Sequence, residues 1–345
     1  MKRWVLPLVL LWIAVPVVAA DDAAMKQAEI EKKVAELTAK LGDPEFEVRD
    51  EARDQLYKLG KPAVPFLRKA SEERRKSGKE EDVKIADRID KVVREIEKKQ
   101  IVEMLQKFIP VGIESPGHFD RDFKEVLAVE GAVPTLKDVF ADEEQTQAIR
   151  GFAADALVQA GDKSVIPDLK KIATDDIESE NIRQAAAATC WLLGEKKPMD
   201  DMIAEAEKRA QEAKDEPARA YQALQRLANF HYSIKQYDKA VEAYNQIETA
   251  MKDEPRYAKS RDRGITQYNL ACCLSLAKRI DEALKALEVS LQCGYNEWKW
   301  LDIDGDLNNL RSDTRFADLV KKYKDKGPED DKEKKDEGKG GGGDE

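Results

Sequence analysis

Few residues in this sequence have a type and spacing that could do chemistry. The chain has two histidines. His118 lies in a polar loop beside Asp120 and Asp122, where an imidazole could titrate near neutral pH. A catalytic or metal site in this loop is therefore one hypothesis. A loop-closing role is the simpler interpretation, because no further group in the motif completes a site.

The acidic run from Asp302 to Asp306 looks at first like a calcium-binding loop. An EF-hand places Gly at position six and Glu at position twelve. Counted from Asp302, Gly305 is fourth and position twelve is Asp313. We therefore interpret these acids as turn and helix-start residues, and predict no metal site. The chain also lacks a nucleophile elbow, a zinc-protease helix and a dinucleotide fingerprint, so we predict no cofactor and no catalytic residue.

The elements that position these residues follow from a motif that occurs three times. An aliphatic-Arg pair is followed by an Ala three residues after the Arg, core residues at seven and ten, and a Gly at eleven. This spacing predicts a helix with one apolar face, ended by the Gly. The second and third copies are 33 residues apart, a period typical of stacked helix pairs. The copies begin at Val48-Arg49, Ile149-Arg150 and Ile182-Arg183.

Aspartates eight residues before two of these arginines, Asp142 and Asp175, suggest a ladder of ion pairs between neighbouring copies. Cys190 takes the core position that Leu56 and Leu157 fill in the other copies, so we expect a buried thiol there. The four cysteines show neither C-x-x-C nor Cys/His spacing, which predicts no disulfide framework.

The composition is typical of helical repeats and of a soluble protein. The chain is 37% charged and 42% hydrophobic, with a formal net charge of −10, which argues against nucleic acid as a partner because phosphates require a basic surface. The N-terminus reads as an export signal: Met1-Lys2-Arg3, an apolar run from Trp4 to Val18, then small residues to Ala20. We expect an exported protein, periplasmic or secreted, with no membrane span in the mature chain. A retained N-terminal anchor is the alternative.

The three copies resemble HEAT repeats of the short bacterial kind, over roughly residues 26–99 and 131–215. From about residue 216 the sequence resembles tetratricopeptide (TPR) repeats, with Ala240 and Tyr244 in one copy and Ala283 and Leu287 in the next. The resemblance implies an all-α solenoid of HEAT-like pairs followed by TPR pairs. The expected parts are a signal peptide 1–20, HEAT-like pairs 21–109, a linker 110–130, HEAT-like repeats 131–215, TPR repeats with a closing segment 216–326, and a charged, Gly-rich tail 327–345.

The resemblance also implies a peptide groove on the inner TPR helices. Asn229 and Asn269 match positions that clasp a peptide backbone or a terminal carboxylate in the family. Gln225 stands where the family has a lysine, and Arg226 could substitute for it. Arg226, Asn229 and Asn269 are therefore the predicted peptide-binding residues. The groove-facing positions of the two inner helices are Gln222, Gln225, Arg226, Asn229, Tyr232, Tyr268, Asn269 and Ser275.

These observations favour a non-catalytic scaffold that binds a protein or peptide partner through its HEAT and TPR surfaces. One alternative is an envelope chaperone or assembly factor that holds extended peptides. Another is an enzyme or accessory subunit with its site near His118. An enzyme would bring titratable groups together in a cleft, whereas a scaffold would present a continuous concave surface.

The export signal makes a direct prediction. We expect the mature chain to begin near Asp21, because the small residues that signal cleavage end at Ala20. Intact-mass measurement on protein from the periplasm or medium checks this. A mass that still includes Trp4 would contradict cleavage and favour the anchor.

Overall fold

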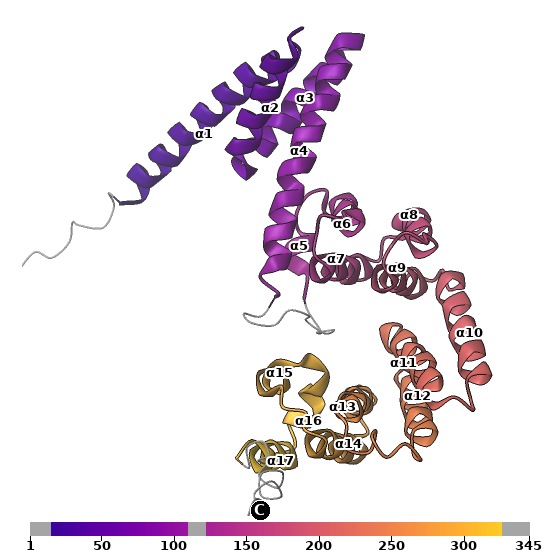
Figure 1. Ribbon diagram of the computed structural model, residues 1–345. Helices are drawn as coiled ribbons and strands as arrows, with labels where there is room; N and C mark the ends of the chain where they lie inside the picture. Colours follow the sequence, from indigo (N-terminus) through magenta and orange to yellow (C-terminus); the bar gives the residue numbers. More distant parts are fainter. Residues whose placement is uncertain (1–14, 110–121, 326–345) are drawn as a thin grey trace, which may run out of the picture. The chain divides into compact units, whose positions relative to one another are not determined.

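The computed structural model describes residues 15–109 and 122–325, and within these ranges every regular element is a helix. Consecutive helices pack against each other in pairs (Figure 1). The chain forms two compact units: the first contains residues 1–106 and 126–139, and the second residues 107–125 and 140–345. An all-α protein of helix pairs was expected. The change of repeat type expected near residue 216 lies inside the second unit.

Short connections join the helices along most of the described chain. Those that begin in the first unit are α1 (Val15–Lys40), α2 (Phe46–Leu59), α3 (Val64–Ser77), α4 (Glu80–Gln106) and α6 (Ala132–Ala141), and α5 (Lys124–Leu127) lies at the boundary. The second unit continues with α7 (Gln147–Ala160), α8 (Ile166–Ala173), α9 (Glu180–Leu192), α10 (Lys197–Glu212), α11 (Pro217–Ser233), α12 (Tyr237–Ala250), α13 (Arg261–Leu276), α14 (Ile280–Gln292), α15 (Trp298–Ile303), α16 (Asn308–Arg311) and α17 (Thr314–Lys324). Three 3₁₀ turns, Lys61–Ala63, Lys163–Val165 and Gly305–Leu307, introduce α3, α8 and α16.

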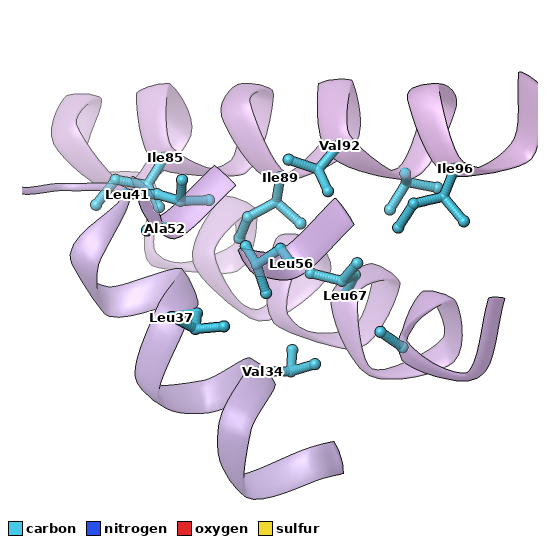
Figure 2. Packing of buried hydrophobic residues seen from close by; sticks show 12 residues of the cluster. Val34, Leu37, Leu41, Ala52, Leu56, Leu67, Ile85, Ile89, Val92 and Ile96 are labelled. Carbon is cyan, nitrogen blue, oxygen red and sulfur yellow. The ribbon is translucent and has the colours of Figure 1, made fainter. Parts of the chain in front are cut away.

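The core of the first unit is an aliphatic seam along α4. Ile85, Ile89, Val92 and Ile96 recur at helical spacing and face Leu56 of α2 and Leu67 of α3 (Figure 2). Leu56, Leu67 and Ile89 have no exposed surface. Each such side chain contributes about 1.5–3 kcal/mol when it is fully buried, so this seam accounts for the long, highly charged α4 remaining helical.

The repeated motif has the structure that its spacing predicts. α2, α7 and α9 are the helices of the three copies, and Gly60, Gly161 and Gly194 follow them with positive φ. The Ala and the core residue seven after the Arg are at most 1% exposed in each copy: Ala52 and Leu56, Ala153 and Leu157, and Ala186 and Cys190. The position ten after the Arg was also expected in the core, but only Leu193 is buried there, whereas Leu59 and Ala160 are partly exposed. Pro65 and Pro167 occupy the first turn of α3 and α8, where a proline costs no helical hydrogen bond.

The prediction that the motif arginines pair with aspartates of neighbouring copies is wrong for Arg150, because its partner is a glutamate. Arg150 pairs with Glu178, in the loop between α8 and α9 of the next copy. Asp142 and Asp175 instead accept hydrogen bonds from the backbone N–H groups of residues two positions later, at 3.2 and 3.0 Å. A short aspartate side chain readily forms this local turn, whereas the longer Glu178 reaches the neighbouring helix.

The C-terminal helices form two matching pairs, α11 with α12 and α13 with α14. Ala240, Ala283 and Leu287 are fully buried at the crossings. Equivalent lysines, Lys235 and Lys278, turn each pair with φ near 60°. The 43-residue spacing between copies results from the ten-residue connection between Ala250 and Arg261, since α12 and α14 have nearly equal lengths.

All four cysteines are free, as expected. Burial raises the pKa of the Cys190 thiol to about 11, so it stays protonated and unreactive at neutral pH. α1 runs across the expected cleavage point at Ala20. Among the described helices, none combines the length and apolarity needed to cross a bilayer.

The buried centre of α7 yields a stability prediction. Leu157 has no exposed surface, and an unpaired carboxylate there costs several kcal/mol of the ~5–15 that a domain has. We expect Leu157→Asp to unfold the HEAT-like helices of the second unit, measured by thermal melting followed by circular dichroism. Exposed Lys171→Asp on α8 is the control. A Leu157→Asp melt equal to that of the wild type would contradict the repeat register.

Candidate binding surface on the C-terminal helices

Two tyrosines on the inner helices hold the segment that closes the array. The hydroxyl of Tyr232, near the end of α11, donates to a carboxylate oxygen of Asp306. The hydroxyl of Tyr268, on α13, donates to Asp304. Asp304 is 3% exposed and Asp306 8%. Hydrogen bonds to ionised acceptors are among the stronger ones in proteins, so these bonds fix the acidic turn against both helices.

Backbone contacts continue the same attachment. The hydroxyl of Ser275 donates to the carbonyl oxygen of Asp306, and the side-chain amide of Asn309 donates to the carbonyl of Ser275 at 2.8 Å. Arg311 donates to the carbonyls of Leu301 and Asp304. The closing segment is therefore attached to α13 through both side-chain and backbone groups, and the Arg311 bonds hold the segment's own turn together.

A thiol completes this buried cluster. The Sγ of Cys272 lies 3.6 Å from Asp304, and the potential ligand atoms of Cys272, Asp304 and Asp306 lie within 4.8 Å of one another. Burial next to the two carboxylates raises the pKa of the Cys272 thiol well above its usual value. A protonated thiol is a weak hydrogen-bond donor, here directed at the Asp304 carboxylate. The cluster thus acts as a hydrogen-bonded joint.

Three of the groove-facing positions expected from the sequence are therefore engaged within the chain. Tyr232, Tyr268 and Ser275 contact the closing segment. The sequence signal for this was present, because the Asp-Gly-Asp run stands directly after the last apolar helix of the array. It was interpreted only as a turn, since the spacing of acids does not show which hydroxyls they will meet.

The other end of the inner face has a different polar centre. The hydroxyl of Tyr244, itself 2% exposed, donates to Oδ1 of Asn229 at 3.2 Å. A hydrogen bond from Asn269 also acts on Tyr244, although burial dominates and raises the pKa of this phenol well above its usual value. Asn229 is exposed and Asn269 half-buried. The structure thus brings these two predicted residues together around one hydroxyl.

Arg226 points to a different neighbour. Its guanidinium forms an ion pair with Glu180 of α9 at 2.7 Å. It also lines a pocket between α9, α10 and α11 with Arg183 and Phe230. The two asparagines meet at Tyr244 without Arg226 in that contact. Glu180, the partner of Arg226, begins α9, which sequence spacing alone does not place near α11.

Of the two histidines, His231 lies among the residues that the structure describes. His118 lies outside the described residues. His231 is 4% exposed, and its Nδ1 lies 3.0 Å from Oε1 of Gln236. Burial lowers the pKa of this imidazole, so the neutral ring packs inside α11 as the sequence indicates.

Comparison with known proteins gives one partial similarity. The chain is 32% identical over 82 residues to a chloroplastic protein of Arabidopsis thaliana. The aligned part is 24% of this chain and 24% of that protein, so the chain spans about a quarter of the length of the curated relative it matches. No protein-family model matches the chain, and no solved structure matches it.

The buried joint predicts a measurable loss of stability. Tyr268→Phe removes the donor to the Asp304 carboxylate and leaves a buried charge with one partner fewer. Hydrogen bonds to charged groups contribute about 1.5–3 kcal/mol, and we expect a loss of that size in the free energy of unfolding measured with urea.

Tyr221→Phe is the matched control, because its hydroxyl meets the neutral hydroxyl of Thr266 at 3.3 Å. Neutral hydrogen bonds contribute about 0.5–1.5 kcal/mol. If both variants lost the same stability, the Tyr268–Asp304 bond would be no stronger than a neutral one.

Proposed function

We propose that this protein is an exported, non-catalytic scaffold that binds a protein or peptide partner through the inner face of its C-terminal helices. The observation that carries the proposal is the meeting of Asn229 and Asn269 at the Tyr244 hydroxyl. Their helices, α11 and α13, are successive inner helices of the expected TPR pairs. Two amides held at fixed positions on adjacent helices suit the regular spacing of a polypeptide backbone.

The chemistry of these groups supports a backbone ligand. A side-chain amide both donates and accepts hydrogen bonds, as does each peptide unit of an extended segment. Tyr244 is buried, so its hydroxyl restrains the amide of Asn229 and lowers the entropy lost when a ligand is bound. Arg226 lies one helical turn before Asn229; its side chain is 44% exposed while it pairs with Glu180, so part of the guanidinium is open to a ligand.

The closing segment supports the same proposal by example. In it, hydroxyls on the inner face of α11 and α13 bind both carboxylates and a backbone carbonyl of one acidic turn, Asp304 to Asp306. This internal contact occupies the part of the inner face that carries Tyr232 and Ser275. We therefore place the partner at the Asn229 and Asn269 end.

Export remains part of the proposal on sequence grounds. The basic start, apolar run and small residues before Asp21 support it. Without the first twenty residues, which carry Lys2 and Arg3 and no acid, the net charge changes from −10 to −12. An acidic surface keeps a protein soluble and disfavours nucleic acid. The partial similarity to the chloroplast protein concerns 82 residues and adds no activity to this proposal.

The groove proposal predicts the effect of a triple substitution. After a partner is captured from the envelope fraction and mapped to residues 216–323, Arg226→Ala, Asn229→Ala and Asn269→Ala together should weaken binding. Each lost hydrogen bond costs about 0.5–1.5 kcal/mol, and up to ~3 where the guanidinium takes part. The combined loss, measured by calorimetry, should reach tenfold or more in Kd.

The control variant changes one asparagine and two cations on the outer helices. Lys239, Asn245 and Lys285 are exposed on α12 and α14, and their replacement by Ala should leave Kd unchanged. Equal Kd values for the wild type and the inner-face triple variant would sink the groove proposal.

A further inference from the structure

The arginine of the repeated motif has different partners in each of the three copies. Arg49 donates to the carbonyls of Asp43 and Pro44 at 2.7 and 2.8 Å. Arg150 donates through Nε to the carbonyl of Phe140 at 2.7 Å and pairs with both carboxylate oxygens of Glu178. In these two copies the guanidinium finds close acceptors inside the fold.

The third arginine is not used in this way. The Nε of Arg183 is buried and has no hydrogen-bond acceptor. Its Nη1 lies 3.5 Å from Asp176, whose side chain is 99% exposed. A guanidinium offers five N–H donors, and a buried donor without an acceptor costs about 1–3 kcal/mol. A buried donor that has no acceptor in the fold needs a physical explanation.

A pocket lies beside this arginine. It has a volume of about 350 Å³ and is formed by α9, α10, α11 and the end of α8. Its apolar lining includes Met202, Ala206 and Phe230. The acids on its walls already have cations: Glu180 pairs with Arg226, Glu205 with Arg209 and Asp201 with Lys197. Among the arginines of the pocket, Arg183 therefore has the longest ion pair, 3.5 Å to the exposed Asp176.

The second copy shows which ligand such an arginine accepts. Arg150 receives the carboxylate of Glu178 from the loop of the following copy. After the third copy the corresponding loop, residues 213–216 between α10 and α11, directs its glutamate elsewhere: Glu216 pairs with Arg219 at 2.8 Å. The hydrogen bonds from Arg150 lower the pKa of Glu178, so this internal ligand is a stable carboxylate at neutral pH.

We propose that Arg183 is a binding residue for a glutamate side chain of a partner protein, with an apolar neighbour of that glutamate resting on Met202 and Phe230. The internal template is Ile177-Glu178-Ser179, in which Ile177 is 94% exposed and Glu178 enters the adjacent copy. The paired acids on the walls repel a segment rich in carboxylates, so one glutamate between uncharged residues fits best. This site rests on the proposed function but lies apart from Asn229 and Asn269.

The test follows the Nε–Hε signal of Arg183 by NMR in the ¹⁵N-labelled full chain. The probe is acetyl-Gly-Ile-Glu-Ser-Gly-amide, and its control has Gln in place of Glu. We expect the Glu probe to shift the Arg183 signal to saturation and the Gln probe to bind at least tenfold more weakly. The Nε signal of Arg209, already paired with Glu205, should move little.

Two further measurements separate the outcomes. Arg183→Lys should weaken binding of the Glu probe tenfold or more, because a lysine cannot form the paired hydrogen bonds of a guanidinium. The double variant Asn229→Ala with Asn269→Ala should bind the Glu probe with unchanged affinity. N-acetyl-isoleucine, as the free acid, stands for a polypeptide C-terminus. No shift at Arg183, equal shifts with the Glu and Gln probes, or a shift with N-acetyl-isoleucine alone would overturn the proposal. Failure of the asparagine variants to affect the mapped partner would instead overturn the groove function.

Discussion

The structure depends on each helix burying an apolar stripe against its neighbours in the chain. A position such as Leu56 or Leu157, fully buried, packs mainly against the helices of its own and adjacent pairs. Within each unit, most contacts join helices that are consecutive or two positions apart in the chain. Stability is then approximately a sum of nearest-neighbour terms, and a polar insertion weakens one interface more than the whole.

An array built from neighbour contacts leaves an unpaired face at its end, and the closing segment covers it with polar as well as apolar groups. Leu301, Leu307 and Leu310 have no exposed surface and extend the core past α14. Asp304 and Asp306 sit beside them and reach the tyrosines of α13 and α11. Buried carboxylates are costly unless their hydrogen bonds are made, so they specify one placement of the segment where apolar contacts alone would allow several.

The sequence predicts the helices well and the polar contacts poorly, for a physical reason. The Ala, core and Gly positions of the motif depend on the 3.6-residue period, which is a local property, and α2, α7 and α9 begin and end accordingly. Partners of polar side chains depend on which helices come together. Glu178 takes the role expected of Asp142 and Asp175 because its side chain is long enough to reach Arg150. Asn229 and Asn269 were placed on neighbouring helices by motif position, but their shared contact with buried Tyr244 required the packing.

The three motif arginines show that position in the array decides what a repeated residue does. Arg49 holds the turn before its own helix, and Arg150 joins its copy to the next through Glu178. Arg183 has the same motif position, yet no following copy supplies an acid, and α10 and α11 leave a pocket beside it instead. In all three copies, a buried N–H donor of the guanidinium that has no acceptor costs free energy. Where the chain does not supply the acceptor, a partner can, and a break in a regular array is thus a physically favoured place for a binding site.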